Sequence, residues 1–293
     1  MKKITLSINP TYLCNFRCDF CYLTSEQLSD KNKLDLNLLK KRLLEVTSSG
    51  YQIEHVDLYG GEIALLPHPY LSELDNLLQE FGDPSINIVT NLSKIHPYFL
   101  EDHIDLSVSF DFKARELSDL VLSNMAVIKK EISVLMLASP ELLKQDIDFM
   151  INILSSMQNI VSVEIKPYSS NQANQLDVEY VEYELFIKEW LKRLHKVSFE
   201  FVNYEQIKLA KSKKRNAFSD DHVYITPSGQ FAVLEFDQSN NEFFMELNNF
   251  DEYINWSISE KERLFTNKAC SSCEFFGHCL TEHYKTSEVK NKS

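Results

Sequence analysis

The chain has 293 residues, a length that fits one large domain or a domain with a small appendage. Hydrophobic residues make up 44% of it, so a substantial core can be buried, and no apolar run reaches the roughly 18 residues that a membrane span requires. The formal net charge of −13 argues against a protein that binds the phosphates of a nucleic acid, because such a protein needs a basic face. We therefore expect no nucleic-acid and no membrane partner, whereas a basic peptide is not excluded.

Short β-branched runs alternate with longer amphipathic runs up to about residue 200. This pattern predicts strands at 4–8, 55–58, 86–89, 106–110, 132–137 and 161–165. It predicts helices at 36–47, 69–81, 97–101 (a short one), 116–129, 141–157 and 178–196. Strands that alternate with helices indicate an α/β fold with a parallel sheet.

Three cysteines lie in the loop after the first predicted strand, at Cys14, Cys18 and Cys21. Thiolates at such close spacing hold iron–sulfur clusters, and a [4Fe–4S] cubane has four irons that each need a ligand. Three local cysteines therefore predict a [4Fe–4S] cluster with one iron open to a ligand from outside the protein. A zinc site usually needs four ligands, and no nearby Cys or His completes such a set. A disulfide framework needs an oxidising compartment, but residues 1–4 lead into a strand and not into a secretory segment, so we expect a cytoplasmic protein.

This cysteine loop, with Tyr22 directly after its third Cys, resembles the signature of the radical S-adenosylmethionine (SAM) enzymes. The resemblance implies a partial (β/α)6 TIM-like barrel whose cluster chelates the amino and carboxylate groups of SAM at its open iron. It also implies reductive cleavage of SAM to a 5′-deoxyadenosyl radical that abstracts hydrogen from a substrate, with an external electron donor such as flavodoxin or ferredoxin. Active-site residues are then expected just beyond the C-terminal ends of the strands.

Polar and glycine motifs do follow these strand ends. Gly60, Gly61 and Glu62 resemble the family's GGE motif, which implies that they seat the amino group of SAM; without the cysteine loop, an ordinary turn would explain them as well. Glycine also lets a strand edge approach a ligand closely. Side chains that resemble the family's ribose and carboxylate contacts follow strands three and four or end them: Thr90, Asn91, Ser107, Ser109 and Asp111. A Ser in a strand equally fits a satisfied polar group of a barrel, and Tyr22 either stacks near adenine or shields the cluster.

The pattern changes after about residue 200. The basic run 211–215 reads as a solvated linker, with a contact for an acidic peptide segment as the alternative. A β-hairpin is expected over 222–226 and 230–236, around the turn Pro227-Ser228-Gly229, followed by a helix at 251–265.

A second cysteine group, Cys270, Cys273 and Cys279, has the spacing C-x2-C-x5-C and resembles part of the SPASM and twitch subdomains, which carry auxiliary iron–sulfur clusters. A full SPASM pattern has a Cys where this chain has His283, so the resemblance implies one auxiliary cluster. Its fourth ligand is left open among His283, Glu282, Asp237, His278 and a substrate atom, and His is known as a cluster ligand. A Cys3His zinc site is the alternative.

The resemblance thus implies a barrel at 1–205 and, at 206–293, a linker with a hairpin and a Cys-rich cluster-binding subdomain. It favours modification of a ribosomally made peptide by crosslinking, epimerisation or another change to backbone or side chain. The alternatives are a dehydrogenase of a small molecule such as an amino sugar alcohol and, in another class, an iron–sulfur electron carrier or sensor. Because the first strand begins near Met1, we expect the barrel rim or a separate protein to bind any leader peptide. No catalytic acid, base or hydrogen donor is assigned.

Overall fold

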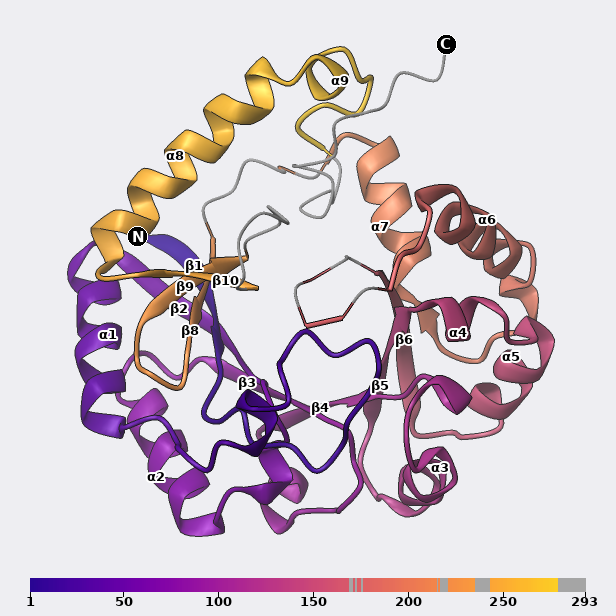
Figure 1. Cartoon of the computed structure of the whole chain (residues 1–293), viewed down its shortest axis with the longest axis horizontal. Coiled ribbons are helices and arrows are strands. Elements are labelled where there is room, and N and C mark those ends of the chain that lie inside the picture. Colours follow the sequence, from indigo (N-terminus) through magenta and orange to yellow (C-terminus); the bar gives the residue numbers. More distant parts are fainter. Residues whose placement is uncertain are drawn as a thin grey trace.

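The computed structural model describes residues 1–168, 171, 173–174, 176–214, 216, 221–234 and 243–278. Within them one sheet of ten strands curves into a ring, and helices cover its outer face (Figure 1). The strand order is β10-β9-β8-β1-β2-β3-β4-β5-β6-β7. Every neighbouring pair from β8 to β7 is parallel, whereas β9 runs antiparallel to both β8 and β10.

The strands are β1 (Lys2–Ile8), β2 (Tyr51–Leu58), β3 (Ser85–Thr90), β4 (Ile104–Ser109), β5 (Ile132–Ala138), β6 (Ile160–Pro167), β7 (Glu200–Phe201), β8 (His222–Ile225), β9 (Phe231–Leu234) and β10 (Phe244–Leu247). The α-helices are α1 (Leu36–Ser48), α2 (His68–Gln79), α3 (Ser118–Val127), α4 (Pro140–Leu143), α5 (Ile147–Ser155), α6 (Tyr180–Leu191), α7 (Val202–Lys211), α8 (Phe250–Thr266) and α9 (Lys268–Ser271). Short 3-10 turns follow several strands, among them η2 (Ile63–Leu65) and η4 (Phe112–Ala114).

The core lies between the outer face of the sheet and the helices. In β1 the apolar side chains Ile4, Leu6 and Ile8 are buried and alternate with Thr5 and Ser7, which therefore point to the inside of the ring. Leu39, Leu43 and Val46 on one side of α1 are fully buried against this outer face. Apolar burial is thus concentrated outside the ring, which leaves its interior for polar side chains.

The predicted α/β fold is confirmed, and each of the six predicted strands overlaps an observed one. The helix predicted at 141–157 is wrong, because the chain forms α4 and α5 in its place. Asp146 accepts a hydrogen bond from the backbone N–H of Phe149 at 2.7 Å, so it caps a new helix where a continuous one was expected. The helix predicted at 178–196 also ends early, at Leu191, and a separate 3-10 turn follows at Leu194–Lys196.

The C-terminal hairpin is part of the barrel sheet. Strand β8 pairs in parallel with β1, with Leu6 opposite Val223 and Ile8 opposite Ile225. The sequence predicted the hairpin but neither this pairing nor helix α7. Lys211, the first residue of the basic run 211–215, is the last residue of that helix. The end of the strand predicted at 230–236, and Arg215 of the basic run, lie outside the described residues.

Arg42 of α1 fastens these C-terminal strands to the barrel. Its guanidinium donates to the carbonyls of Gly229 at 2.7 Å and Asn248 at 2.8 Å and to Oε1 of Gln230 at 2.6 Å. It also lies over the ring of Phe231, 5.2 Å from the centroid. The planar, multi-donor guanidinium therefore joins α1 to the turn between β8 and β9 and to the residue that follows β10.

None of the helices in the described parts of the chain has the length and apolar character needed to cross a membrane.

Candidate active site

The cysteine loop is held to the end of β2 by a short backbone ladder. The N–H of Tyr59 donates to Ile8 O at 3.0 Å, that of Gly61 to Thr11 O at 2.9 Å and that of Glu62 to Leu13 O at 2.8 Å. These bonds continue the pairing of β1 and β2 past the ends of both strands. They fix the start of the loop that carries Cys14 relative to the barrel.

Two glycines make this ladder sterically possible. A Cβ at Gly61 would lie 2.2 Å from Leu13 O, and a Cβ at Gly60 would lie 2.7 Å from Thr11 O. Gly60 also has φ +138°, a conformation that side-chain-bearing residues rarely adopt. We predicted that these glycines allow a ligand to approach; in the structure they allow the cysteine loop itself to approach.

Glu62 is completely buried and its carboxylate is bonded within the protein. It accepts from Thr90 Oγ1 at 2.6 Å, from the N–H of Asn91 at 2.7 Å and from the N–H of Ala64 at 2.8 Å. Burial raises the pKa of this carboxyl, and the three hydrogen bonds work against that rise. Glu62 thus ties the ends of β2 and β3 together, and a contact with SAM stays a prediction for it and for Thr90 and Asn91.

The three thiols of the loop are partly exposed and surrounded by N–H donors. Cys14 Sγ lies 3.4 Å from the N–H of Phe16 and 3.9 Å from Nδ2 of Asn91. Cys21 Sγ lies 3.4 Å from the N–H of Leu23. Burial raises the pKa of each of the three thiols. Donors aimed at sulfur suit thiolates that bind a cluster, because hydrogen bonds to the sulfurs stabilise their negative charge.

No group of three or more His, Cys, Asp or Glu side chains among the described residues is placed to hold a single metal ion.

Arg115 is a feature of this site that the sequence analysis missed. Its guanidinium pairs with the fully buried Asp111, at 2.8 Å from Nε and 2.6 Å from Nη2, and its Nη1 lies 3.7 Å from Cys18 Sγ. It also lies over the ring of Phe20, 5.1 Å from the centroid. The carboxylate of Asp111 holds Arg115 and accepts from the N–H of Leu137, and the predicted contact of Asp111 with SAM stays a prediction. The i,i+4 spacing of Asp111 and Arg115 was the available signal.

The remaining predicted SAM contacts are separated by the structure. Ser109 lies at the end of β4 and is partly exposed, at the same end of the barrel as the cysteine loop. Ser107 instead points to the interior and donates to Asn87 Oδ1 at 3.0 Å. Tyr22 stacks on Phe243, with ring centroids 4.3 Å apart, so one face of its ring is already covered. Stacking of Tyr22 on adenine stays a prediction.

The second cysteine group is described only in part. Cys270 lies in α9 and is partly exposed, and Cys273 follows that helix and is exposed. The N–H of Cys273 donates to the carbonyl of Cys270 at 3.0 Å, which forms a tight turn between the two. Cys279 and His283, and the alternative ligands Asp237 and Glu282, lie outside the described residues. The auxiliary site stays a prediction.

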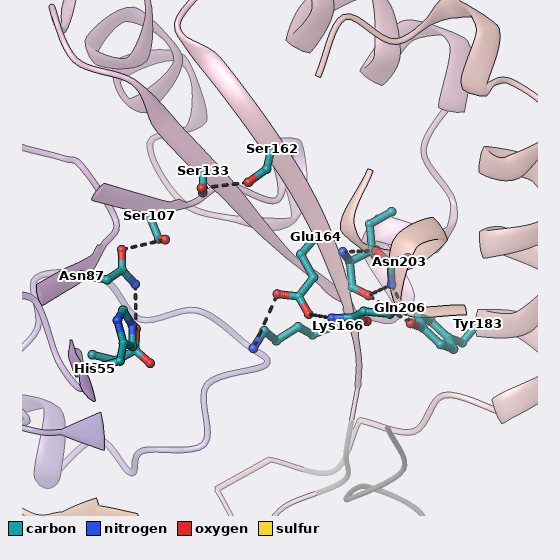
Figure 2. A network of polar contacts seen from close by, with 12 residues as sticks. His55, Asn87, Ser107, Ser133, Ser162, Glu164, Lys166, Tyr183, Asn203 and Gln206 are labelled. Atoms are coloured by element: carbon teal, nitrogen blue, oxygen red, sulfur yellow. Dashed lines mark hydrogen bonds and ion pairs between the residues drawn. The ribbon is translucent and has the colours of Figure 1, made fainter. Parts of the chain in front are cut away.

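Below the strand ends, the interior of the ring is lined by polar side chains (Figure 2). On β2 and β3, His55 Nε2 lies 3.2 Å from Asp57 Oδ1, which also accepts from Asn87 Nδ2 at 2.7 Å. Other interior pairs are Ser7 with His222 at 2.8 Å, Ser133 with Ser162 at 2.8 Å, and Glu164 with Gln206 at 3.1 Å. The interiors of TIM barrels are usually packed with branched apolar residues, so this lining is a departure.

The hydrogen bond that His55 donates to Asp57 raises the pKa of His55, although burial works against it. For Asp57, burial works to raise the pKa, but the hydrogen bonds from His55 and Asn87 together hold it below its usual range.

Comparison with known proteins supports the fold. No family model matches the sequence, and no curated protein matches it in sequence. Among solved structures, the same fold occurs in a radical SAM enzyme, the coproporphyrinogen III oxidase HemN from Escherichia coli, with 11% identity and a TM-score of 0.50 over 89% of this chain and 75% of that one.

Two further structures align with higher scores. Streptococcus suis SuiB bound to S-adenosylmethionine has 16% identity and a TM-score of 0.67 over 95% of this chain and 72% of SuiB. The protein anSMEcpe with bound AdoMet and Cp18Cys peptide has 13% identity and a TM-score of 0.69, with 99% and 91% covered. At these identities the likeness establishes the fold, which is the partial barrel of radical SAM enzymes.

The first prediction concerns the glycine ladder. We expect Gly61→Ala to destabilise the protein by about 1–3 kcal/mol and to lower iron incorporation, because its Cβ meets the carbonyl of Leu13. Urea unfolding and iron content after anaerobic reconstitution measure the two effects. Gly82→Ala is the control without a clash: its φ of +110° strains the backbone, but no atom lies within 4 Å of the added Cβ, so iron incorporation should stay normal. Normal stability and normal iron content in the Gly61 variant would contradict the role of the ladder.

The second prediction concerns Glu62. We expect Glu62→Gln to lower the free energy of unfolding by about 1–3 kcal/mol in the absence of SAM. The new amide has one oxygen and one NH2 group, so at least one buried donor that now bonds to the carboxylate would face an N–H and lose its acceptor. Glu131→Gln, at an exposed position, is the matched control and should unfold like the wild type. If the Glu62 variant kept full stability and lost only SAM affinity, Glu62 would be a ligand contact and not the structural tie described above.

The third prediction concerns pH. The raised pKa of His55 contributes stability that is present below its ordinary value of 6.5 and is lost as pH rises through the raised value. The lowered pKa of Asp57 contributes stability that is present above 3.8 and is lost as pH falls through the lowered value. A double-mutant cycle of His55→Gln and Asp57→Asn should therefore give a coupling of up to ~1 kcal/mol near pH 5.5. The coupling should disappear by about pH 9; a constant coupling over this range would show that the pair is not ionic.

Proposed function

We propose that this chain is a radical SAM enzyme whose SAM-binding cluster is held by Cys14, Cys18 and Cys21. The observation that carries the proposal is the loop of three thiols, with N–H donors directed at their sulfurs, at the C-terminal end of β1 in a barrel of this fold. When bound, the cluster and SAM supply reductive cleavage of SAM and hydrogen-atom abstraction from a substrate.

The chain's own residues prepare this site. The ladder through Gly61 and Glu62 fixes the loop, and Asn91 and Arg115 direct N–H groups at Cys14 and Cys18. Asp111 orients Arg115, whose positive charge offsets the charge that thiolates bring to a partly buried loop. The proposed SAM contacts are Gly60, Gly61, Glu62, Thr90, Asn91, Ser107, Ser109 and Asp111, with Tyr22 near adenine.

For the substrate we propose a ribosomally made peptide. SuiB has been solved bound to precursor peptide SuiA, and anSMEcpe with bound AdoMet and Cp18Cys peptide, and both share this fold. A dehydrogenase of a small polyhydroxy or amino compound is the second candidate, favoured by the polar interior of the barrel. An external electron donor such as flavodoxin or ferredoxin completes either proposal.

An auxiliary iron–sulfur cluster is proposed for Cys270, Cys273 and Cys279 with His283, and zinc is the alternative. The proposed functional division, with the SAM barrel at 1–205 and the auxiliary unit at 206–293, does not follow the sheet, because β8 of the second part pairs with β1 of the first.

The fourth prediction tests the reaction. Anaerobically reconstituted wild type should bind about eight irons, and a Cys14/Cys18/Cys21→Ala variant about four. Wild type reduced with dithionite should convert SAM to 5′-deoxyadenosine and methionine, and this variant should not. A Cys270/Cys273/Cys279→Ala variant is the control and should keep cleaving SAM.

Iron binding without SAM cleavage in the wild type would assign the chain to electron carriers or sensors. Retained zinc with about four irons would make the C-terminal group a zinc site.

A further inference from the structure

The wall of the barrel interior formed by β2, β3 and β4 carries a continuous chain of polar side chains (Figure 2). Ser85 Oγ lies 2.7 Å from His55 Nδ1, His55 Nε2 lies 3.2 Å from Asp57 Oδ1, and Asn87 links Asp57 to Ser107. All of these side chains lie on strands of the barrel, so the regular backbone fixes their spacing.

Chemistry determines the direction of the two hydrogen bonds that Asn87 makes, with Asp57 and with Ser107. An ionised carboxylate only accepts, so Asn87 must turn its Nδ2 to Asp57 and its Oδ1 to Ser107. Ser107 has a single proton and must donate it to that oxygen. The hydroxyl oxygen of Ser107 therefore has only lone pairs left for a further partner, and 7% of the residue is exposed to receive one.

Asp57 has acceptor capacity left as well. Within the described parts of the chain, both donors that reach its carboxylate, His55 and Asn87, end on Oδ1, which leaves Oδ2 as an acceptor. The Asp57 side chain is 26% exposed, so a ligand in the interior can reach it. Asp57 stands opposite Ser7 of β1, whose hydroxyl is 2.8 Å from Nε2 of His222.

The wall on the other side of the barrel is different. Glu164 of β6 accepts from Gln206 at 3.1 Å and lies 3.8 Å from the ammonium of Lys166. The side chain of Lys166 is 52% exposed, so this wall carries an exposed cation beside its carboxylate. The interior thus has an acceptor wall at β2–β4 and a cationic position at β6.

We infer that the β2–β4 wall, through Asp57 and Ser107, binds a hydrogen-bond-donor group of the substrate, and that this group is a cation: an ammonium or a guanidinium. This specificity rests on the proposed function and goes beyond it, because it states which part of a peptide side chain or small amine enters the barrel. Charge-assisted hydrogen bonds to a carboxylate are about twice as strong as neutral ones, which is why a cation is favoured over an alcohol. Ser107, first placed among the SAM contacts, is reassigned to the substrate.

The fifth prediction tests this wall with four probes of similar size: n-butylammonium, n-butylguanidinium, n-butanol and n-butyrate. Isothermal titration of the anaerobically purified, cluster-loaded protein, at a pH above that at which the His55–Asp57 ion pair is lost, should show the two cations binding at least about tenfold more tightly than butanol, with butyrate weakest. Asp57→Asn should reduce this preference to within about twofold, and Ser107→Ala should weaken cation binding by about three- to tenfold.

Asp148→Asn is the matched control, because it removes one carboxylate that is paired with Arg193 and Lys196 outside this wall. It should leave the preference unchanged. Similar affinity for all four probes, or an undiminished preference in Asp57→Asn, would overturn the proposal, and Ser107→Ala decides the matter if Asp57→Asn does not fold. SAM cleavage is measured in the same samples without probe: cleavage without cation preference rejects the wall, whereas cation preference without cleavage rejects the proposed function.

Discussion

The candidate site depends on the backbone ladder between the cysteine loop and the end of β2. Three N–H···O bonds carry the pairing of β1 and β2 past both strands, and they form only because Gly60 and Gly61 have no side chain to meet the opposite carbonyls. Glu62 then extends the connection to the end of β3 through Thr90 and Asn91. The loop that carries the thiols is thereby fixed to the ends of three neighbouring strands, β1, β2 and β3. This gives the loop the rigidity that a preorganised site requires.

Much of the fold could be predicted from the sequence, because buried β-branched runs and amphipathic runs report local structure directly. What local patterns do not contain is pairing between distant segments: nothing in residues 222–225 indicates that they pair with β1. The break at Asp146 could have been found, because an aspartate there competes as a helix cap, but the apolar periodicity on both sides concealed it.

The location of the candidate site could be predicted from the sequence, but the partners of its charged side chains could not. The cysteines, the glycines and the polar residues at strand ends lie at one end of the barrel, as their sequence positions indicate. The partners of the charged groups were not predictable, because they depend on which residues packing brings together. Asp111 holds Arg115, and Glu62 accepts three hydrogen bonds within the protein, so both carboxylates shape the site before any ligand arrives. Buried carboxylates are retained only where such partners offset their loss of water.

The pairing of β8 with β1 also has a consequence for how the chain is made. Ser7 and His222 are hydrogen-bonded partners separated by 215 positions, so β1 can pair with β8 only after more than 200 further residues have been synthesised. During synthesis one edge of β1 has its backbone groups unpaired while the rest of the barrel is translated, and an open edge invites pairing with other chains. Contacts of such long sequence separation form late and slow folding. The C-terminal hairpin therefore completes this side of the sheet last. A chain truncated before residue 222 is expected to expose the unpaired edge of β1, to which other chains can add, while keeping most of its helices.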